Sequence, residues 1–145
     1  MTTFSLLKLV HTFGFVAWFV GLLGTTAAQV AARKAPGREG RLAAWSVVKR
    51  LSPFEVVGLI VTPLAGIGVA ATGGMFKLGF VHAKFTLVVI AVVFNLLVIA
   101  KRRQVGKQIE ADSADLSATM KRLAMFHGIA TVMLPLAILA VYLMR

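Results

Sequence analysis

The chain has 145 residues, of which 59% are hydrophobic and only 14% are Asp, Glu, Lys or Arg. A soluble domain usually carries about a quarter charged residues, so this composition excludes an ordinary water-soluble domain. Cysteine is absent, which excludes disulfides, iron–sulfur clusters and thiolate metal sites.

Four apolar stretches account for this composition, at residues 4–32, 54–72, 83–100 and 123–144. Each is close to the ~20 residues with which a helix crosses a hydrocarbon core ~30 Å thick. We therefore predict an all-α integral membrane protein, a four-helix bundle that forms a single transmembrane domain over residues 1–145. Its helices are expected at about residues 4–32, 53–72, 83–101 and 115–144.

The first stretch is too long for a cleaved signal peptide and lacks a clean small-residue cleavage site, so we expect a retained helix. Lys8, His11, Gly14 and Trp18 follow one another at spacings of three, three and four residues, which places them on one helical face. Histidine is a common axial ligand of haem iron, and Gly14 is expected to leave room for the macrocycle. The alternative is a histidine that hydrogen-bonds a neighbouring helix or rests among lipid headgroups.

The second helix is predicted to begin at Ser52 and Pro53, with Ser52 as N-cap and Glu55 in the first turn. The basic stretch before it, residues 37–50, is expected to form a short interfacial helix. Small residues recur at intervals that suit close packing of helices in lipid. They are Gly14 and Gly21 on the first helix, and Gly58, Thr62 and Gly66 on the second.

His82 lies directly before the third stretch, and Lys84 is its second residue. At ~1.5 Å per residue, both lie at about the same depth as His11 on the first helix. Lys84 could extend outward to the headgroups or pair with an anionic ligand such as a porphyrin propionate or a lipid phosphate. His82 lies at the boundary, and by itself it is expected to be solvated rather than ligating.

His127 on the fourth stretch is expected near the side of the membrane opposite to His11. Glu55 and Asn95 fall at a comparable depth on the second and third helices. The simplest expectation is a hydrogen bond from His127 to Glu55 or Asn95. A proton path or a second haem at this level is the alternative, because ionisable residues inside a membrane are costly and mark functional sites.

The positive charges determine the expected topology. Twelve of the 16 Lys and Arg residues lie in the two segments that join the first helix to the second and the third to the fourth. Only Lys8, Lys77, Lys84 and Arg145 lie on the other side. The positive-inside rule then predicts that both basic segments are cytoplasmic and that both termini face outward. The charge indicates contact with anionic lipids rather than with nucleic acid.

One family resemblance is visible in these segments. Residues 7–23, LKLVHTFGFVAWFVGLL, resemble the first helix of HemJ-type protoporphyrinogen oxidases and related CopD-like membrane proteins, which carry Lys, then His, Trp and Gly. Residues 73–76 and 79–84, GGMF and GFVHAK, resemble the junction of their second and third helices, where His-Ala-Lys recurs.

The resemblance implies a four-helix membrane fold with haem b as its cofactor. It implies that His11 is the metal ligand and that Gly14, Trp18 and His82 contribute to the cofactor site. Lys84 would bind the cofactor and act as the candidate catalytic residue, beside a propionate or the substrate carboxylates. The implied reaction is the flavin-independent oxidation of a porphyrinogen.

Two segments depart from the family pattern. HemJ-type enzymes carry an arginine late in the first helix, where this chain reads GTTAAQ at residues 24–29. Their fourth helix carries an Asn-Glu-x-Pro element, where this chain reads MFHGIA at residues 125–130. The resemblance therefore bears on the fold and the cofactor more than on the substrate.

Three functions follow from these patterns. The first is a haem b-binding membrane oxidoreductase or electron carrier in the bacterial inner membrane. The second is a non-catalytic accessory subunit of a larger membrane complex, or a homo-oligomer, because four short helices leave much surface for partners. The third is copper handling of the CopD-like type, for which the six Met and three His residues would supply ligands.

Overall fold

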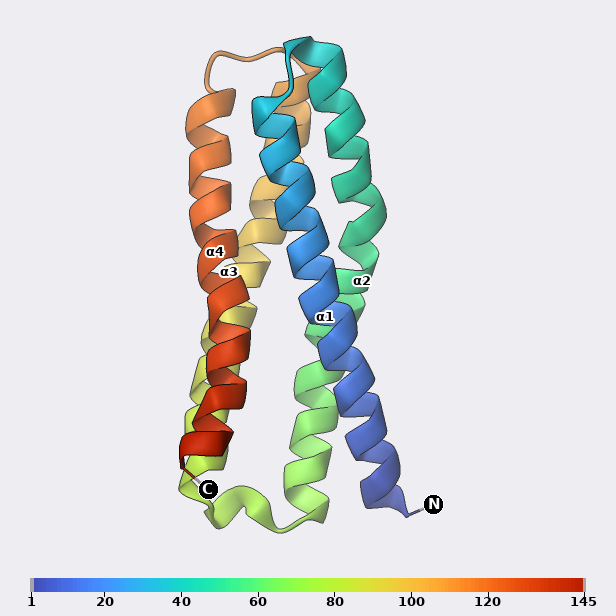
Figure 1. Ribbon diagram of the computed structural model, residues 1–145, viewed down its shortest axis with the longest axis vertical. Coiled ribbons are helices and arrows are strands. Elements are labelled where there is room, and N and C mark those ends of the chain that lie inside the picture. The colour runs from blue at the N-terminus through green and yellow to red at the C-terminus, as the bar shows by residue number, and fades with distance from the viewer. Residues whose placement is uncertain (1, 145) are drawn as a thin grey trace.

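In the computed structural model, which describes residues 2–144, four long helices run up and down beside one another (Figure 1). They are α1 (Thr3–Lys34), α2 (Gly37–Thr72), α3 (Gly79–Glu110) and α4 (Leu116–Leu143). A short 3₁₀ turn, η1 (Met75–Lys77), joins α2 to α3, and the described residues contain no strand. Each of the four helices is long and apolar enough to cross a membrane, which confirms the predicted all-α, four-helix class.

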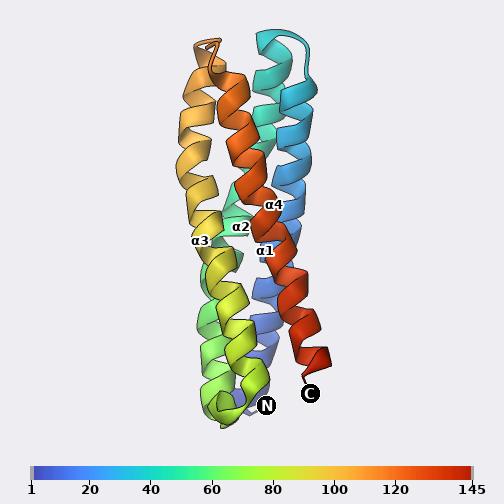
Figure 2. The same cartoon turned by 90° about the vertical axis from the view of Figure 1, so that its left-hand side faces the viewer.

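The four helices pack as two pairs. Contacts are most extensive between α1 and α2 and between α3 and α4, and weaker contacts of α1 with α4 and of α2 with α3 close the bundle. Figure 1 shows the α3–α4 pair on the left and the α1–α2 pair on the right, and Figure 2, turned by 90°, shows the first pair in front of the second. The two ends of the described chain lie at one end of the bundle, and the α1–α2 and α3–α4 connections lie at the other.

Glycines bring α1 and α2 together. A Cβ atom added to Gly58 would lie 2.3 Å from the backbone nitrogen of Trp18, and one added to Gly21 would lie 2.6 Å from the backbone nitrogen of Glu55. Neither position leaves space for a side chain, because the atoms that it would meet are backbone atoms of the facing helix. The small residues that recur at packing intervals in the sequence therefore lie in the α1–α2 interface.

The second helix starts earlier than predicted. It begins at Gly37 rather than at residue 53, so Pro53 lies inside it and Ser52 does not cap it. The segment before Pro53 is held by packing, because Trp45 and Val48 are buried in a cluster with residues of all four helices. This burial outweighs the hydrogen bond that Pro53 cannot donate. The separate interfacial helix expected over residues 37–50 is therefore part of α2.

The third helix is also longer than predicted. It ends at Glu110 rather than near residue 101, because Val105 and Ile109 are fully buried in the same cluster. The 36 residues of α2 correspond to a length of about 54 Å, well beyond a hydrocarbon core of about 30 Å. The bundle thus continues past the apolar spans at the end that carries the basic segments.

Candidate functional site

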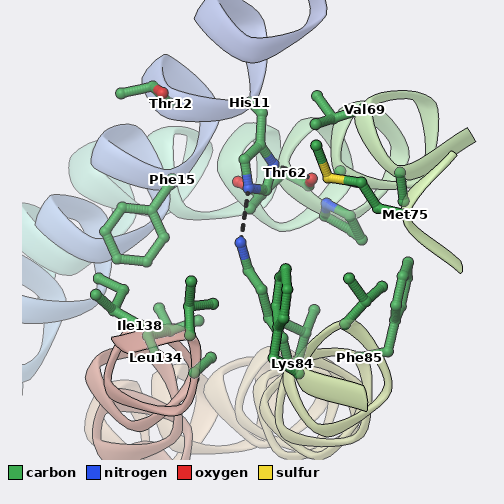
Figure 3. Close-up of a pocket in the computed structure, with 18 residues that line it drawn as sticks. His11, Thr12, Phe15, Thr62, Val69, Met75, Lys84, Phe85, Leu134 and Ile138 are labelled. Carbon is green, nitrogen blue, oxygen red and sulfur yellow. Dashed lines mark hydrogen bonds between the residues drawn. The ribbon is translucent and has the colours of Figure 1, made fainter. Parts of the chain in front are cut away.

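The His11 side chain is fixed against α2 (Figure 3). Its Nδ1 atom lies 2.8 Å from the backbone carbonyl oxygen of Thr62. The ring also lies over Gly66, where an added Cβ atom would be 3.0 Å from Cε1 and 3.2 Å from Nδ1 of His11. A carbonyl oxygen only accepts hydrogen bonds, so Nδ1 carries a proton and donates it to Thr62. Gly66 provides the space that this geometry needs.

The other ring nitrogen of His11 meets Lys84. Nζ of Lys84, on α3, lies 3.3 Å from Nε2 of His11 and both side chains are half-buried. Because Nδ1 carries the proton, Nε2 of the neutral ring is free to accept a hydrogen bond from the ammonium group. The structure thus brings together two of the three residues that the sequence placed at one depth, His11 and Lys84 but not His82. It leaves a basic nitrogen of His11 directed away from α2.

Nε2 and Lys84 lie on a mainly apolar cavity of about 310 Å³ between the two helix pairs. Its wall includes Phe15, Phe85, Val88 and Leu134, so all four helices contribute. Thr62 also lines it, and the Thr62 hydroxyl is buried with no hydrogen-bond partner among the described residues. A polar atom left without a partner beside an apolar cavity is typical of a site that receives a ligand group.

A second, wider cavity of about 660 Å³ adjoins the first towards the end of the bundle that carries the termini. The second cavity adds Lys8 to the lining. The residues that both walls share are His11, Thr12, Val69, Met75, Phe80 and Val141. An elongated ligand would therefore find an apolar chamber beside His11 and Lys84, and a further cation nearer the surface.

Three other predicted site residues lie outside the first cavity. The backbone of Gly14 lies against α2, where an added Cβ would be 2.8 Å from Val61, so it leaves no room for a macrocycle. Trp18 is fully buried in the apolar core. His82 is exposed and lines neither cavity. The face shared by His11, Gly14 and Trp18 turns into the α1–α2 interface, and only its flank reaches the cavity.

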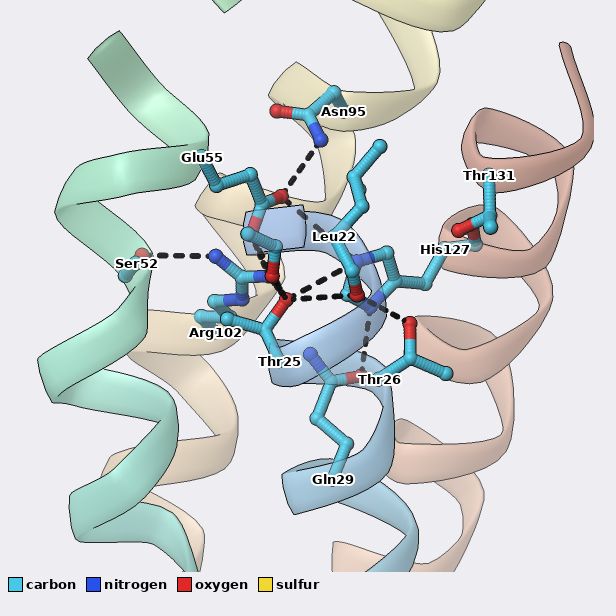
Figure 4. A network of polar contacts seen from close by, with 11 residues as sticks. Leu22, Thr25, Thr26, Gln29, Ser52, Glu55, Asn95, Arg102, His127 and Thr131 are labelled. Carbon is cyan, nitrogen blue, oxygen red and sulfur yellow. Dashed lines mark hydrogen bonds and ion pairs between the residues drawn. The ribbon is translucent and has the colours of Figure 1, made fainter. Parts of the chain in front are cut away.

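A second polar site lies deeper, around Glu55 (Figure 4). The Glu55 carboxylate is fully buried and pairs with the guanidinium group of Arg102, at 2.5 Å between Oε2 and Nη2. Asn95 donates to Oε1 at 2.6 Å, and the hydroxyl of Thr25 lies 2.9 Å from Oε2. Arg102 also donates to the hydroxyl of Ser52 at 2.8 Å. The charge of Glu55 is therefore compensated inside the bundle.

His127 completes this network. Its Nδ1 atom lies 3.1 Å from Oε1 of Gln29, and Nε2 lies 3.4 Å from Thr25 and 3.8 Å from Oε1 of Glu55. The sequence placed Glu55, Asn95 and His127 at one level, and the structure brings the three together. The closest partner of His127 is nevertheless Gln29, rather than Glu55 or Asn95.

Four members of this network were not predicted: Thr25, Gln29, Ser52 and Arg102. Arg102 was assigned to a basic loop because the third helix was expected to end near residue 101. A signal was present, since Asn95 and Arg102 are seven residues apart and share a helical face, as do Thr25 and Gln29 at a spacing of four. The spacing of Asn95 and Arg102 places them on one face only if the third helix continues past residue 101, as α3 does.

An apolar layer separates the two polar sites. It includes Trp18, Leu22, Leu59 and Leu134, all buried. The indole nitrogen of Trp18 has no hydrogen-bond partner in the described part of the chain. No group of three or more His, Asp or Glu side chains suited to a metal ion is found among the described residues. Any metal bound beside His11 would therefore have to bring most of its other ligands with it, as a porphyrin does.

Comparison of the chain with family models, with curated proteins and with solved structures gave no match.

Proposed function

We propose that this protein is a haem b-binding membrane oxidoreductase or electron-transfer protein, in which His11 would hold the iron. The observation that carries the proposal is the orientation of the His11 ring. Nδ1 donates to the Thr62 carbonyl, so the lone pair of Nε2 points away from α2, towards Lys84 and the cavity that both side chains line. A ligating histidine usually donates its other nitrogen to a carbonyl or carboxylate, because this fixes the tautomer and makes the ligand more basic.

The residues around the cavity fit such a cofactor. Phe15, Phe85 and Leu134 supply apolar walls for a macrocycle. Lys84 and, in the adjoining cavity, Lys8 supply cations for its carboxylates. Nε2 has one lone pair, so Lys84 must release it before His11 can ligate iron. The released ammonium group is then available to a propionate or to the carboxylates of a substrate.

Bound haem would supply one-electron transfer, and the chain's own residues would position it and determine its surroundings. The Thr62 carbonyl fixes the His11 ring that would hold the iron, and the apolar wall would keep water away from it. The oxidation of a porphyrinogen is the concrete reaction suggested by the resemblance of residues 7–23 and 79–84 to HemJ-type enzymes. Lys84 is then the residue assigned to the substrate carboxylates.

The proposed setting is the cytoplasmic membrane of a bacterium. Both basic connections lie at one end of the bundle, opposite the described termini. The positive-inside rule supports a cytoplasmic location for that end. The haem cavity would then open towards the outer side of the membrane.

The test is an absorption spectrum of the detergent-purified protein, taken oxidised and then reduced with dithionite. We expect a Soret band and sharp α and β bands, which His11→Ala should abolish. His82→Ala is the matched control, because His82 is exposed and lines neither cavity, and it should leave the spectrum unchanged. A featureless spectrum from cells with ample haem, or bands that survive in His11→Ala, would contradict the proposal.

A further inference from the structure

A third cavity lies at the basic end of the bundle, between α2 and α3. It has a volume of about 430 Å³, and Trp45, Val48 and Gly106 form the apolar part of its wall. The rest of the wall consists of four cationic side chains, one carboxylate and one hydroxyl: Lys49, Arg102, Arg103, Lys107, Glu110 and Ser52. We refer to this cavity as the basic groove. It is separate from the cavity at His11, which shares none of these residues.

The groove carries an excess of positive charge. Arg102 is compensated by Glu55 below it, and Nζ of Lys49 lies 3.7 Å from the Glu110 carboxylate. Arg103 and Lys107 are exposed, and neither forms an ion pair with any described residue. Two cations of the groove therefore lack a counter-charge in the described part of the chain.

Two donors in the wall of the groove have no acceptor among the described residues. Trp45 is only 3% exposed, yet its indole nitrogen donates to none of the described residues. That nitrogen lies beside Gly106, where an added Cβ would be 3.1 Å away, so the missing side chain keeps the groove open next to it. Nε of Arg102 is buried without a partner as well. A ligand with several acceptor oxygens would satisfy donors of this kind.

The groove also lies at the right depth for a lipid headgroup. Lys49 and Arg103 lie just beyond the apolar spans of α2 and α3. Large exposed apolar residues follow on the membrane side, Phe54 on α2 and Leu96 and Leu97 on α3. Basic pockets between transmembrane helices on the cytoplasmic side are suited to anionic headgroups, and tryptophan is common at this level.

We propose that the basic groove binds the phosphate group of an anionic phospholipid. The phosphate oxygens would accept from the Trp45 indole and pair with Arg103 and Lys107, while the acyl chains would lie along the exposed apolar residues below. Free phosphate offers the same oxygens but gains nothing from that apolar surface, so we assign the lipid as the ligand. This inference does not depend on haem binding.

The experiment is a titration of the delipidated, detergent-solubilised full chain with short-chain phosphatidylglycerol, followed by native mass spectrometry. We expect saturable binding of phosphatidylglycerol, with much weaker binding of phosphatidylcholine and of inorganic phosphate. The double variant Arg103→Gln/Lys107→Gln should bind phosphatidylglycerol about tenfold or more weakly, since each cation near the headgroups favours anionic lipid. Trp45→Phe should weaken binding as well, because it removes the donor and keeps most of the ring.

Lys121→Gln/Arg122→Gln is the matched control, since it removes two exposed charges from α4 at the same end of the bundle but outside the groove. It should bind like the wild type. If the control and the groove variant lost phosphatidylglycerol affinity equally, the loss would be due to overall charge, and the proposal would be overturned. Inorganic phosphate that binds as tightly as the lipid would overturn the assignment to a lipid. Both double variants change only exposed side chains, so the comparison holds even if Trp45→Phe does not fold.

Discussion

His11 on α1 and Lys84 on α3 meet at 3.3 Å across a diagonal of the bundle, although no pair of Cα atoms from these two helices lies within 8 Å. Thr25 and Arg102 bridge the same diagonal one level deeper, at 3.0 Å. Long or flexible polar side chains thus link two helices whose backbones stay apart. The space between the pairs is filled by polar groups at two depths, by apolar side chains between them and, at His11, by a cavity.

The ammonium group of Lys84 is held in a mainly apolar cavity, so we expect it to serve binding rather than stability. Lys84→Met keeps the length of the side chain and removes the charge. The thermal unfolding midpoint in detergent should stay the same or rise, because a desolvated cation is costly. Affinity for a porphyrin with free carboxylates should fall about tenfold, which corresponds to about 1.4 kcal/mol. A lower midpoint together with unchanged porphyrin affinity would contradict this role.

Gly66 is expected to control the position of the His11 ring. In Gly66→Ala the new methyl group would press on Cε1 and Nδ1, at 3.0 and 3.2 Å, and move the ring from the Thr62 carbonyl. Loss of such a supporting hydrogen bond typically costs about 10–100-fold in metal affinity, so haem retention should fall and the reduced bands should shift.

Gly128→Ala provides the control for this prediction. Gly128 lies in α4 and an added Cβ would meet nothing within 4 Å. This variant should keep the wild-type spectrum and unfold at the same or a higher temperature, because alanine is favoured over glycine in a helix by about 1 kcal/mol. Identical spectra for the Gly66 and Gly128 variants would show that Gly66 does not position His11.

We expect the buried ion pair of Glu55 and Arg102 to affect the stability of the protein, which unfolding experiments can measure. Arg102→Met leaves a fully buried carboxylate without its cation, so we expect a loss of about 3–5 kcal/mol in stability. Glu55→Gln combined with Arg102→Met should recover most of it, because no uncompensated charge remains. Circular dichroism during heating in detergent gives the comparison. Arg103→Met removes an exposed neighbour and should change little; equal effects of Arg102→Met and Arg103→Met would exclude the buried pair.

The proposed topology can be measured cleanly because the chain has no cysteine of its own. Thr2→Cys places a thiol at the end that carries the termini, and Ala114→Cys places one in the exposed α3–α4 connection. A membrane-impermeant maleimide should label Thr2→Cys in intact cells. It should label Ala114→Cys only after the membrane is permeabilised, and the opposite pattern would reverse the orientation.

The sequence was sufficient to predict the four apolar helices and the level along the bundle at which their polar residues lie. Hydropathy over about 20 residues is a local property, and a constant rise per residue converts position into depth. This is why His11 and Lys84 could be expected at one level, and Glu55, Asn95 and His127 at another. The close α1–α2 contact at Gly58 also follows a local spacing of small residues.

Only the tertiary structure decided where α2 begins and what each face of α1 meets. Pro53 and the basic residues before it predicted that the second helix begins there. Because Trp45 and Val48 are buried against other helices, α2 begins at Gly37 instead. The face with Gly14 and Trp18 read as a cofactor wall, yet it packs against α2. Both outcomes depend on contacts between residues far apart in the chain, and a periodic pattern contains no information on which neighbour covers which face.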